Sequence, residues 1–359
     1  MSSHNHKNQN GSTKIPSKDM PSLPENFFPV FIKNQFRTTI QLPTKDRYPN
    51  VKGQCGIITG SNTGLGYEAS RQLLSLGLSH LVMGVRSLAK GKAAASKLRT
   101  ENPSAKIDVW ALDMESYDSI QAFVRKCNDD LPRIDMVILN AGMGAMKFNA
   151  VPATGHEKTV QVNHVSTVLL TILLLPVLRK KSRSNGATRP PVITVVNSAT
   201  AHLCKLPNKD SRPFLASFDD PAKFDANERY GASKLLCQLF IVKLADLVDP
   251  NNAIINMVDP GLTKGTELAR EVPGFVAPIL KLGMAVVGRP LDRAAATYVD
   301  AVLGHGKESH GCFLMNEEIV GLSKWYHTDG EALTAAIWNE TMQDLKFAGV
   351  DEIVASMHT

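Results

Sequence analysis

Tyr230 and Lys234 stand four residues apart in a stretch whose pattern predicts a helix, so both side chains project from one helix face. A phenol has an ordinary pKa of about 10, which is too high for acid–base catalysis near neutral pH. A neighbouring cation such as the Lys234 ammonium would stabilise the phenolate and lower that pKa. A hydroxyl from elsewhere, with Ser198 as the candidate, could hydrogen-bond a reacting carbonyl or alcohol. The pair alone does not identify a site, because Tyr and Lys at this spacing also occur on solvated helix faces.

A glycine-rich turn earlier in the chain predicts a phosphate-binding site. Residues 54–59 have the pattern of a buried strand, and a helical pattern follows the turn through Leu76. Strand, turn and helix in this order present backbone N–H groups and a helix N-terminus to a pyrophosphate. The glycine spacing is G-x-x-x-G-x-G rather than the commoner G-x-G-x-x-G. We predict cofactor contacts from Gly60, Ser61, Asn62, Thr63, Gly64, Leu65 and Gly66.

The end of the next predicted strand, residues 80–84, indicates which dinucleotide would bind. A site that prefers NAD carries an acidic residue here to hold the ribose 2′-hydroxyl. In this chain Val85 occupies that place and Arg86 follows it. A 2′-phosphate would therefore meet a guanidinium rather than a repelling carboxylate, which favours NADP(H) as the cofactor.

Four further apolar runs predict strands at residues 107–112, 134–139, 192–196 and 253–258, separated by helical patterns. This alternation predicts an α/β protein with a single Rossmann-type, doubly wound parallel sheet and helices on both faces. Ligands of such sheets bind beyond the carboxyl ends of the strands. The candidate residues at those ends, or opening the helix after one, are Asp113 (which could reach an adenine edge), Met114, Asn140, Ala141, Gly142, Asn163, Ser198, Pro260, Gly261 and Thr263.

With these residues in order from about Val51 to Leu322, the chain resembles a short-chain dehydrogenase/reductase. The resemblance implies that Tyr230 is the general acid–base and that Ser198 orients the substrate oxygen. It also implies that Lys234 binds the nicotinamide ribose and lowers the Tyr230 pKa. In the same scheme Asn163 helps to hold a proton-relay water, and Asn140 supports the sheet near the cofactor.

Two stretches resemble particular branches of this family. Residues 85–87, with Lys90 and Gly91, are similar to retinol-dehydrogenase-like members. Residues 260–270 are similar to fungal members associated with secondary metabolism.

The chain also departs from the compact family pattern. Ser198 and Tyr230 lie far apart in sequence, so residues 200–229 are expected to form an added loop over the pocket. One extra residue after Gly261 leaves open whether Thr263 or Thr266 contacts the nicotinamide carboxamide. Residues 262–290 are expected to form a lid, whose apolar members suggest a bulky, rather apolar substrate: Phe275, Ile279, Leu280, Leu282 and Met284.

The rest of the chain divides into three parts. Residues 1–19 are polar and predict a disordered tail. Residues 20–50 form a leading segment, whose apolar patch at residues 27–32 could pack on the domain, which we favour, or touch a membrane surface. Residues 51–322 are assigned to the dehydrogenase domain, and residues 323–359 to a C-terminal helical extension.

Composition excludes several classes of function. The chain is 43% hydrophobic, 21% charged and only 6% aromatic, with a net charge of +6, which does not indicate a nucleic-acid surface. The five cysteines lack metal-ligand spacing and predict reduced thiols with no metal site. The length of the apolar run at residues 165–178 suits a buried helix better than a transmembrane one, and this helix could be a dimer face or lie buried within one subunit. We therefore expect a cytoplasmic protein without a transmembrane segment.

The sequence predicts an NADP(H)-dependent oxidoreductase that interconverts a ketone or aldehyde and an alcohol. Its partner would be a medium-sized, rather apolar small molecule, with secondary-metabolite (polyketide-type) biosynthesis as the expected setting. One alternative is a retinol- or steroid-type alcohol dehydrogenase that works oxidatively. Another is an NADP-sensing regulator without chemistry, which would have no need to keep Ser198, Tyr230, Lys234 and Asn163 together.

Overall fold

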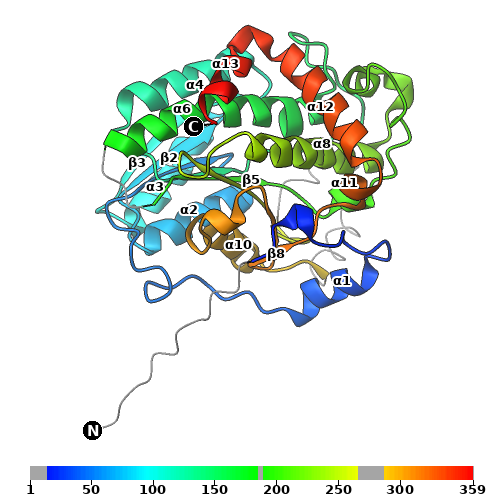
Figure 1. Cartoon of the computed structure of the whole chain (residues 1–359). Helices are drawn as coiled ribbons and strands as arrows, with labels where there is room; N and C mark the ends of the chain where they lie inside the picture. Colours follow the sequence, from blue (N-terminus) through cyan, green and yellow to red (C-terminus); the bar gives the residue numbers. More distant parts are fainter. Residues whose placement is uncertain (1–13, 185–188, 266–286, 359) are drawn as a thin grey trace.

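The computed structural model describes residues 14–184, 189–265 and 287–358 (Figure 1). Its centre is one eight-stranded sheet in the order β3-β2-β1-β4-β5-β6-β7-β8. Neighbouring strands pair in parallel from β3 to β7, and β8 pairs antiparallel with β7 at the edge. The strands are β1 (Cys55–Thr59), β2 (His80–Val85), β3 (Lys106–Ala111), β4 (Met136–Leu139), β5 (Val192–Val196), β6 (Ile254–Asp259), β7 (Phe313–Met315) and β8 (Glu318–Val320).

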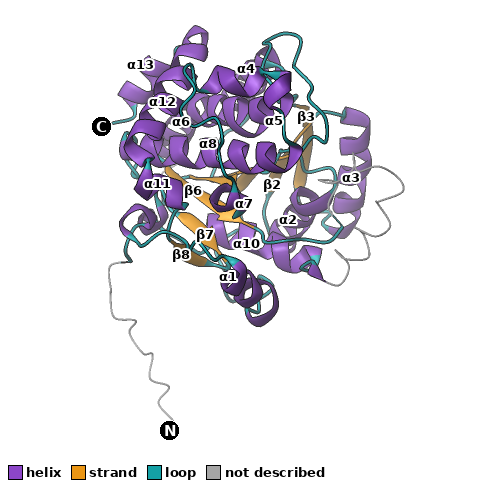
Figure 2. Ribbon diagram, turned by 90° about the vertical axis from the view of Figure 1, so that its right-hand side faces the viewer, coloured by secondary structure: helices purple, strands orange, loops and turns teal. Residues whose placement is uncertain are grey.

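Helices cover both faces of the sheet, so its inner strands are buried on both sides and read as continuous apolar runs (Figure 2). Adjacent residues of β1 show the two faces: Ile58 belongs to the core shared with Leu73 and Val299, and Ile57 to the core shared with Leu170 and Phe240. The first face carries α2 (Gly64–Ser75), α3 (Leu88–Glu101) and α10 (Leu291–Leu303). The second carries α4 (Tyr117–Asp130), α6 (Ser166–Ser184) and α8 (Ala226–Asp246), with α12 (Gly330–Asp344) and α13 (Val350–Ser356) packed outside them.

Short elements join these layers. They are α1 (Phe28–Ile32), α5 (Lys158–Val160), α7 (Thr200–Leu203), α11 (Lys324–Thr328), the π-helical turns η2 (Lys33–Arg37) and η3 (Gln161–Val165), and the 3-10 turns η1 (Ser17–Asp19), η4 (Leu215–Asp219), η5 (Pro221–Lys223), η7 (Lys307–Ser309) and η8 (Lys346–Ala348).

The predicted doubly wound fold is confirmed, and each of the six predicted strands is present within one or two residues of its expected ends. Strands β7 and β8 were not predicted, because three residues are too few to show a periodicity. They extend the sheet beyond β6 and bring the chain back beside the leading segment, where Leu23 N donates to Leu322 O at 3.1 Å.

The apolar run at residues 165–178 lies in a core helix. The helical stretch Lys158–Ser182 is long and apolar enough to cross a membrane by length and composition, but 89% of its most apolar window is buried inside the protein. Leu169, Ile172 and Leu174 are fully buried within the one chain. For residues 165–178, the structure therefore favours a helix buried within one subunit over a dimer face.

Part of the segment that was predicted to be a disordered tail is packed against the sheet. Residues 1–13 lie outside the described part of the chain, but Ser17, which was assigned to the disordered tail, is fully buried. Its hydroxyl accepts a hydrogen bond from Phe313 N at 2.9 Å, and Lys18 pairs with Asp246 at 2.6 Å. The prediction of disorder through Asp19 is thus wrong for residues 14–19, because β7 offers them a partner that the local composition does not reveal.

Residues 200–229, expected as an added loop, are partly core. Phe214 and Phe218 are buried, and their rings pack edge to face with centroids 5.3 Å apart. The carboxylate of Glu340 on α12 accepts hydrogen bonds from Phe214 N at 2.8 Å and Leu215 N at 2.6 Å. The segment is therefore anchored beneath the C-terminal extension before it leads into α8.

Candidate active site

The glycine turn has the geometry of an anion-binding site. Gly60 and Gly64 have φ of +63° and +59°, which favour glycine. Helix α2 begins at Gly64, and the side chain of its N-cap, Thr63, makes no capping hydrogen bond. The first amides of α2 are thus left without a side-chain acceptor, as a pyrophosphate site at a helix N-terminus requires.

Asn140 ties the end of β4 to this turn. Its amide donates to Thr59 O at 2.9 Å and to Gly60 O at 3.2 Å, while Ala141 N donates to Thr59 Oγ1 at 2.9 Å. A Cβ on Gly66 would lie 2.5 Å from Asn140 Nδ2 and 2.7 Å from Gly60 O. The absence of a side chain at residue 66 therefore lets the start of α2 approach Asn140 and the turn closely.

At the end of β2, Arg86 already has a partner that sequence reasoning missed. Its guanidinium pairs with Glu115 at 2.9 Å, and Lys158 binds the same carboxylate at 2.9 Å. The Arg86 side chain is 59% exposed, so it remains open to solvent. Asp113 uses one carboxylate oxygen to accept Glu115 N at 3.0 Å. At this strand end, Arg86 and Lys158 therefore both bind the Glu115 carboxylate. The sequence did not predict this cluster, because its three residues lie far apart in the chain.

The four predicted catalytic residues are brought together beyond the ends of β4 and β5. Ser198 lies close enough to the Tyr230 hydroxyl to lower its pKa, and Lys234 Nζ lies 5.8 Å from the centroid of the Tyr230 ring. Lys234 also donates to Val196 O at 2.8 Å. A Cβ on Gly142 would lie 3.1 Å from Asn163 Oδ1 and 3.5 Å from Lys234 Nζ, so this glycine keeps the space between them open.

The carboxamide of Asn163 is held on both of its sides. Its Oδ1 accepts Met143 N at 2.9 Å, and its Nδ2 donates to Met143 O at 2.7 Å and to Ser233 Oγ at 3.0 Å. Asn163 lies in the π-helical turn Gln161–Val165, an irregularity that is frequent at functional sites. These contacts fix the β4 loop, η3 and α8 relative to one another.

The pKa of Tyr230 is raised, whereas it was expected from the sequence to be lowered. Burial and the charge of Asp259 raise the pKa of Tyr230, and the Ser198 hydrogen bond opposes them by lowering it. Burial lowers the pKa of Lys234 to about 8, against the opposite effects of Cys237 and Asp259. The lowered tyrosine pKa is therefore not present in the protein alone, and a bound cationic nicotinamide ring would have to supply the missing stabilisation.

Asp259, at the end of β6, is a neighbour that sequence reasoning overlooked. It is buried, which raises its pKa, whereas backbone hydrogen bonds from Ala199 and Gly261 and the charges of Arg289 and Lys234 lower it. It thus links the loops after β5 and β6. The signal for it was available, since it directly follows the predicted strand and precedes Pro260.

The loop after β6 contains the third group of predicted cofactor contacts. Gly261 has φ of +75°, and Thr263 is buried with its hydroxyl donating to Gly261 O at 2.9 Å. Arg289 donates to Pro260 O at 2.9 Å. Thr266 and the lid residues 266–286 lie outside the described part of the chain, so the choice between Thr263 and Thr266 stays open.

Aromatic side chains connect the loop after β4 to residues 200–229, the inserted segment. Phe148 of the β4 loop packs edge to face against Phe224 of the inserted segment, with centroids 6.0 Å apart. The Arg229 guanidinium lies 5.3 Å from the Phe224 ring. A Cβ on Gly144 would lie 3.6 Å from Tyr230 Cδ2, so the β4 loop passes close to the phenol ring.

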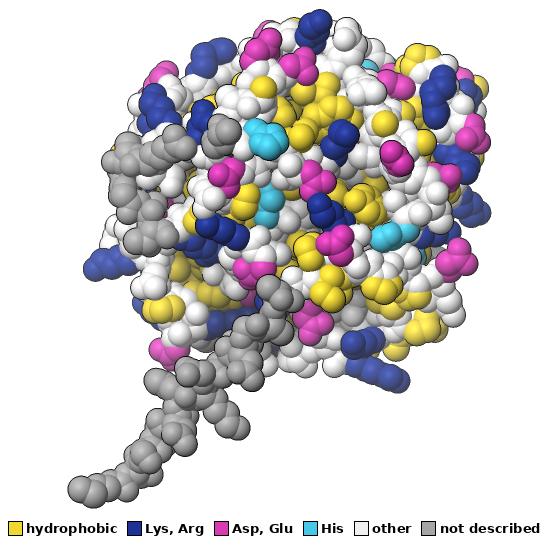
Figure 3. Space-filling view, in the orientation of Figure 1, with side chains coloured by type: hydrophobic (Ala, Val, Ile, Leu, Met, Phe, Trp, Pro, Cys, Tyr) yellow, Lys and Arg dark blue, Asp and Glu magenta, His cyan; other side chains and the backbone are white. Residues whose placement is uncertain are grey.

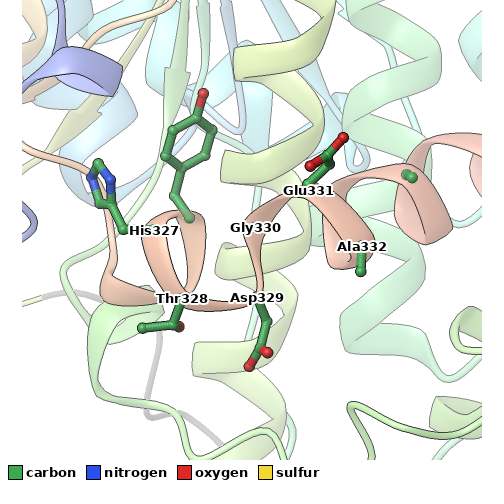
Figure 4. A pocket seen from close by; sticks show the side chains of 8 residues that line it. His327, Thr328, Asp329, Gly330, Glu331 and Ala332 are labelled. Atoms are coloured by element: carbon green, nitrogen blue, oxygen red, sulfur yellow. The ribbon is translucent and has the colours of Figure 1, made fainter.

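Two hollows are lined by residues other than Asn163, Ser198, Tyr230 and Lys234. One, of about 360 Å³, is bordered by the inserted segment and by Arg229 and Ala232 of α8. The other, of about 670 Å³, lies at the junction of α11 and α12. Figure 4 shows that its Asp329 and Glu331 side chains point in different directions, and Asp329 pairs with Lys209 at 2.9 Å. Neither hollow is lined by the predicted catalytic residues, so we locate the reaction at the strand ends instead.

The surface and the cysteines add little chemistry. On the face shown in Figure 3, basic and acidic side chains are interspersed, as on an ordinary solvated surface. All five cysteines are free and buried. Within residues 14–184, 189–265 and 287–358, no group of three or more His, Cys, Asp or Glu side chains is placed to hold a metal ion.

A parallel sheet whose first strand passes through a glycine turn into a helix defines the class of dinucleotide-binding α/β proteins. The family model for short chain dehydrogenase matches residues 54–200. The chain is 47% identical over 345 residues to the short chain dehydrogenase/reductase mfmJ of Annulohypoxylon moriforme, covering 96% of this chain and 99% of that relative. It is also 46% identical over 325 residues to the short chain dehydrogenase virL of Hypocrea virens, covering 90% and 93% of the two chains. This protein belongs to the short-chain dehydrogenase/reductase family.

The fold is also similar to that of solved short-chain dehydrogenase structures. The NADPH-dependent 3-quinuclidinone reductase of Rhodotorula rubra superposes with a TM-score of 0.56 at 19% identity, over 80% of this chain and 97% of that chain. Similarity at this level supports the shared fold and leaves the cofactor and the substrate of this chain to other arguments.

Proposed function

We propose that this oxidoreductase uses NADP(H) to interconvert a ketone or aldehyde and the corresponding alcohol. The observation that carries the proposal is the convergence of Ser198, Tyr230, Lys234 and Asn163 beyond the strand ends, next to an open glycine turn. A binding protein without chemistry has no physical need for a phenol, a hydroxyl and an ammonium in this arrangement.

The bound nicotinamide would supply or accept the hydride at the carbonyl carbon. In the reductive direction, the Tyr230 hydroxyl donates a proton to the carbonyl oxygen, and Ser198 hydrogen-bonds the same oxygen and orients it. Lys234, held by Val196 O, binds the ribose and stabilises the phenolate that forms. Asn163 fixes the β4 loop and helps to hold the water that returns a proton to the site.

The preference for NADP(H) rests on the end of β2. Val85 provides no carboxylate for a ribose 2′-hydroxyl, and Arg86 provides an exposed cation for a 2′-phosphate. Glu115 is the opposing charge, because it pairs with Arg86 and would repel a phosphate. Lys158 offsets part of that repulsion by binding the same carboxylate. Binding of NADP(H) therefore requires Arg86 to share its guanidinium between the phosphate and Glu115.

For the substrate, we propose a medium-sized and rather apolar molecule that lies against Phe148 and Phe224. The two relatives come from fungi and cover nearly the whole chain, which supports a setting in fungal secondary metabolism, with polyketide-type products as the substrate class. A cytoplasmic location and a homodimer remain predictions.

The oxidative alternative, a retinol- or steroid-type alcohol dehydrogenase, uses the same residues in reverse, and the direction depends on the cellular ratio of the two cofactor forms. The regulator alternative predicts binding without turnover. The assay mixes purified protein with NADPH or NADH and a panel of cyclic, aromatic and aliphatic ketones and aldehydes. Loss of the cofactor's absorbance at about 340 nm would distinguish an oxidoreductase from a regulator that only binds the cofactor. We expect oxidation of NADPH with at least one apolar carbonyl compound; tight binding of NADPH without turnover of any carbonyl compound would favour the regulator.

A further inference from the structure

The leading segment before the sheet contacts two of the loops that carry the candidate site. Pro24 O accepts a hydrogen bond from His202 Nε2 at 2.8 Å, and the Phe27 ring lies 5.8 Å from the His202 ring. His202 lies on α7, immediately after the Ser198 loop. Near its other end, the segment reaches the loop after β6 through Gln35 and Asn34. Figures 1 and 2 both show α1 beside the β7–β8 edge of the sheet.

Gln35 makes the most direct contact with the loop after β6. Its side-chain amide donates to Leu262 O at 2.7 Å and to Val287 O at 2.9 Å. A Cβ on Gly261 would lie 3.3 Å from Gln35 Oε1, so this side chain lies against the glycine that is predicted to contact the cofactor. One amide therefore fixes two chain segments that are separated by 24 residues in sequence.

Arg289 holds the same loop to the leading segment through its guanidinium. It donates to Pro260 O at 2.9 Å, to Asn34 O at 2.7 Å and to Asn316 Oδ1 at 2.6 Å. The side chain is only 5% exposed, and burial lowers its pKa. A buried guanidinium is tolerated only when its N–H groups have hydrogen-bond acceptors. Because Asn34 O is one of these acceptors, the leading segment helps to stabilise the buried charge of Arg289.

Apolar packing alone does not account for the position of this segment. Phe27 is buried, but Phe28 and Phe36 are 67% and 53% exposed. The segment thus leaves two large rings in solvent while its polar groups pair with the loop. Its register is therefore set in part by the hydrogen bonds of Gln35 and Asn34, which reach the loop after β6.

We propose that residues 24–37 form a clasp that positions the Pro260–Gly261–Leu262 loop for the nicotinamide half of the cofactor, with Gln35 and Arg289 as positioning residues. The inference rests on the proposed function, because it assumes that this loop contacts the nicotinamide. The adenosine half lies at the glycine turn and at Arg86, far along the sheet from the clasp in strand order. Loss of the clasp should therefore weaken binding of the whole dinucleotide and leave binding of its adenosine half unchanged.

The test compares two ligands on the same variants by isothermal titration calorimetry. Gln35→Met keeps the size of the side chain but removes both donors, and Gln41→Met is the matched control at an exposed glutamine of the same segment. NADPH is paired with 2′,5′-ADP, and NADH with ADP, so that the result does not depend on the 2′-phosphate preference. We expect the Kd of the full dinucleotide to rise about five- to thirty-fold in Gln35→Met, the effect of losing one or two hydrogen bonds, while the adenosine fragments and the control bind as the unaltered protein does.

Two results would overturn the clasp: an unchanged Kd for both dinucleotides, or an equal loss for the dinucleotides and their fragments, which would mark a general loss of structure. Thermal unfolding of each variant, read beside the titrations, identifies the second case. Failure of the proposed function looks different, because the unaltered protein itself would then bind neither dinucleotide, or would bind NADPH without turning over any carbonyl compound.

Discussion

His156 is expected to make the stability of the protein depend on pH. Its Nδ1 lies 3.0 Å from an Asp219 carboxylate oxygen, and its Nε2 lies 3.2 Å from Asp344, which also accepts the Tyr117 hydroxyl at 3.2 Å. The two carboxylates raise the pKa of His156 from 6.5 to about 10, against the opposite effect of burial. This cluster joins the segment before α5, the inserted segment and α12.

The sign of the effect follows from the raised pKa. The folded protein holds a proton on His156 that the unfolded chain releases above pH 6.5, so the stabilisation is complete below pH 6.5 and is lost as the pH rises toward 10. At about 1.4 kcal/mol per pH unit, the interval from 6.5 to about 10 sets an upper limit of about 5 kcal/mol. Because the ring is paired with two partly exposed carboxylates, we expect about 2–3 kcal/mol to be observed.

The assay is urea unfolding of the unaltered protein and of His156→Gln at pH 6 and pH 9.5, with His358→Gln, at an exposed histidine, as the control. The difference in unfolding free energy between the unaltered protein and His156→Gln should be about 2–3 kcal/mol at pH 6 and should shrink to less than about 1 kcal/mol at pH 9.5. A difference of the same size at both pH values, or a variant more stable than the unaltered protein at pH 6, would refute the reasoning.

Three further predictions concern the turn, the inserted segment and the cofactor preference. Gly66→Ala places a Cβ 2.5 Å from Asn140 Nδ2 and should raise the dinucleotide Kd by about 5–150-fold, from a strain of about 1–3 kcal/mol at the turn, as measured by calorimetry. Glu340→Gln turns an NH₂ group toward one of the two backbone amides that the carboxylate binds, and should lower the unfolding free energy by about 1–3 kcal/mol in urea titrations. Arg86→Asp removes one of the two cations that bind Glu115 and should shift the ratio of kcat/KM toward NADH at least about ten-fold; an unchanged ratio would show that the end of β2 does not select the cofactor.

The strands and their ends could be predicted because a parallel sheet covered on both faces needs continuous apolar runs, and polar residues then mark where each run ends. The proximity of Tyr230 and Lys234 followed from helix geometry alone. Their approach to Ser198 followed from the rule that the carboxyl ends of parallel strands meet at one edge. These constraints are local or topological, and both kinds can be inferred from the sequence alone.

The contacts that the sequence did not reveal join residues far apart in the chain. Glu340 anchors the inserted segment, and Gln35 reaches Leu262, across distances along the chain that no periodicity spans. Ser17 is ordered only because β7 lies beside it. The pKa of Tyr230 likewise depends on burial and on Asp259, which are properties of the packed site rather than of a motif.

The central claim is that Tyr230 transfers the proton in a hydride-transfer reaction. Tyr230→Phe removes the hydroxyl whose pKa Ser198 lowers and leaves the ring, and therefore most of the packing, in place. With a carbonyl compound that the unaltered protein reduces, kcat should fall by about 10²–10⁴-fold, while the Kd for NADPH stays within about three-fold of its original value. A kcat near that of the unaltered protein would contradict the account, since no other group has been assigned to deliver that proton.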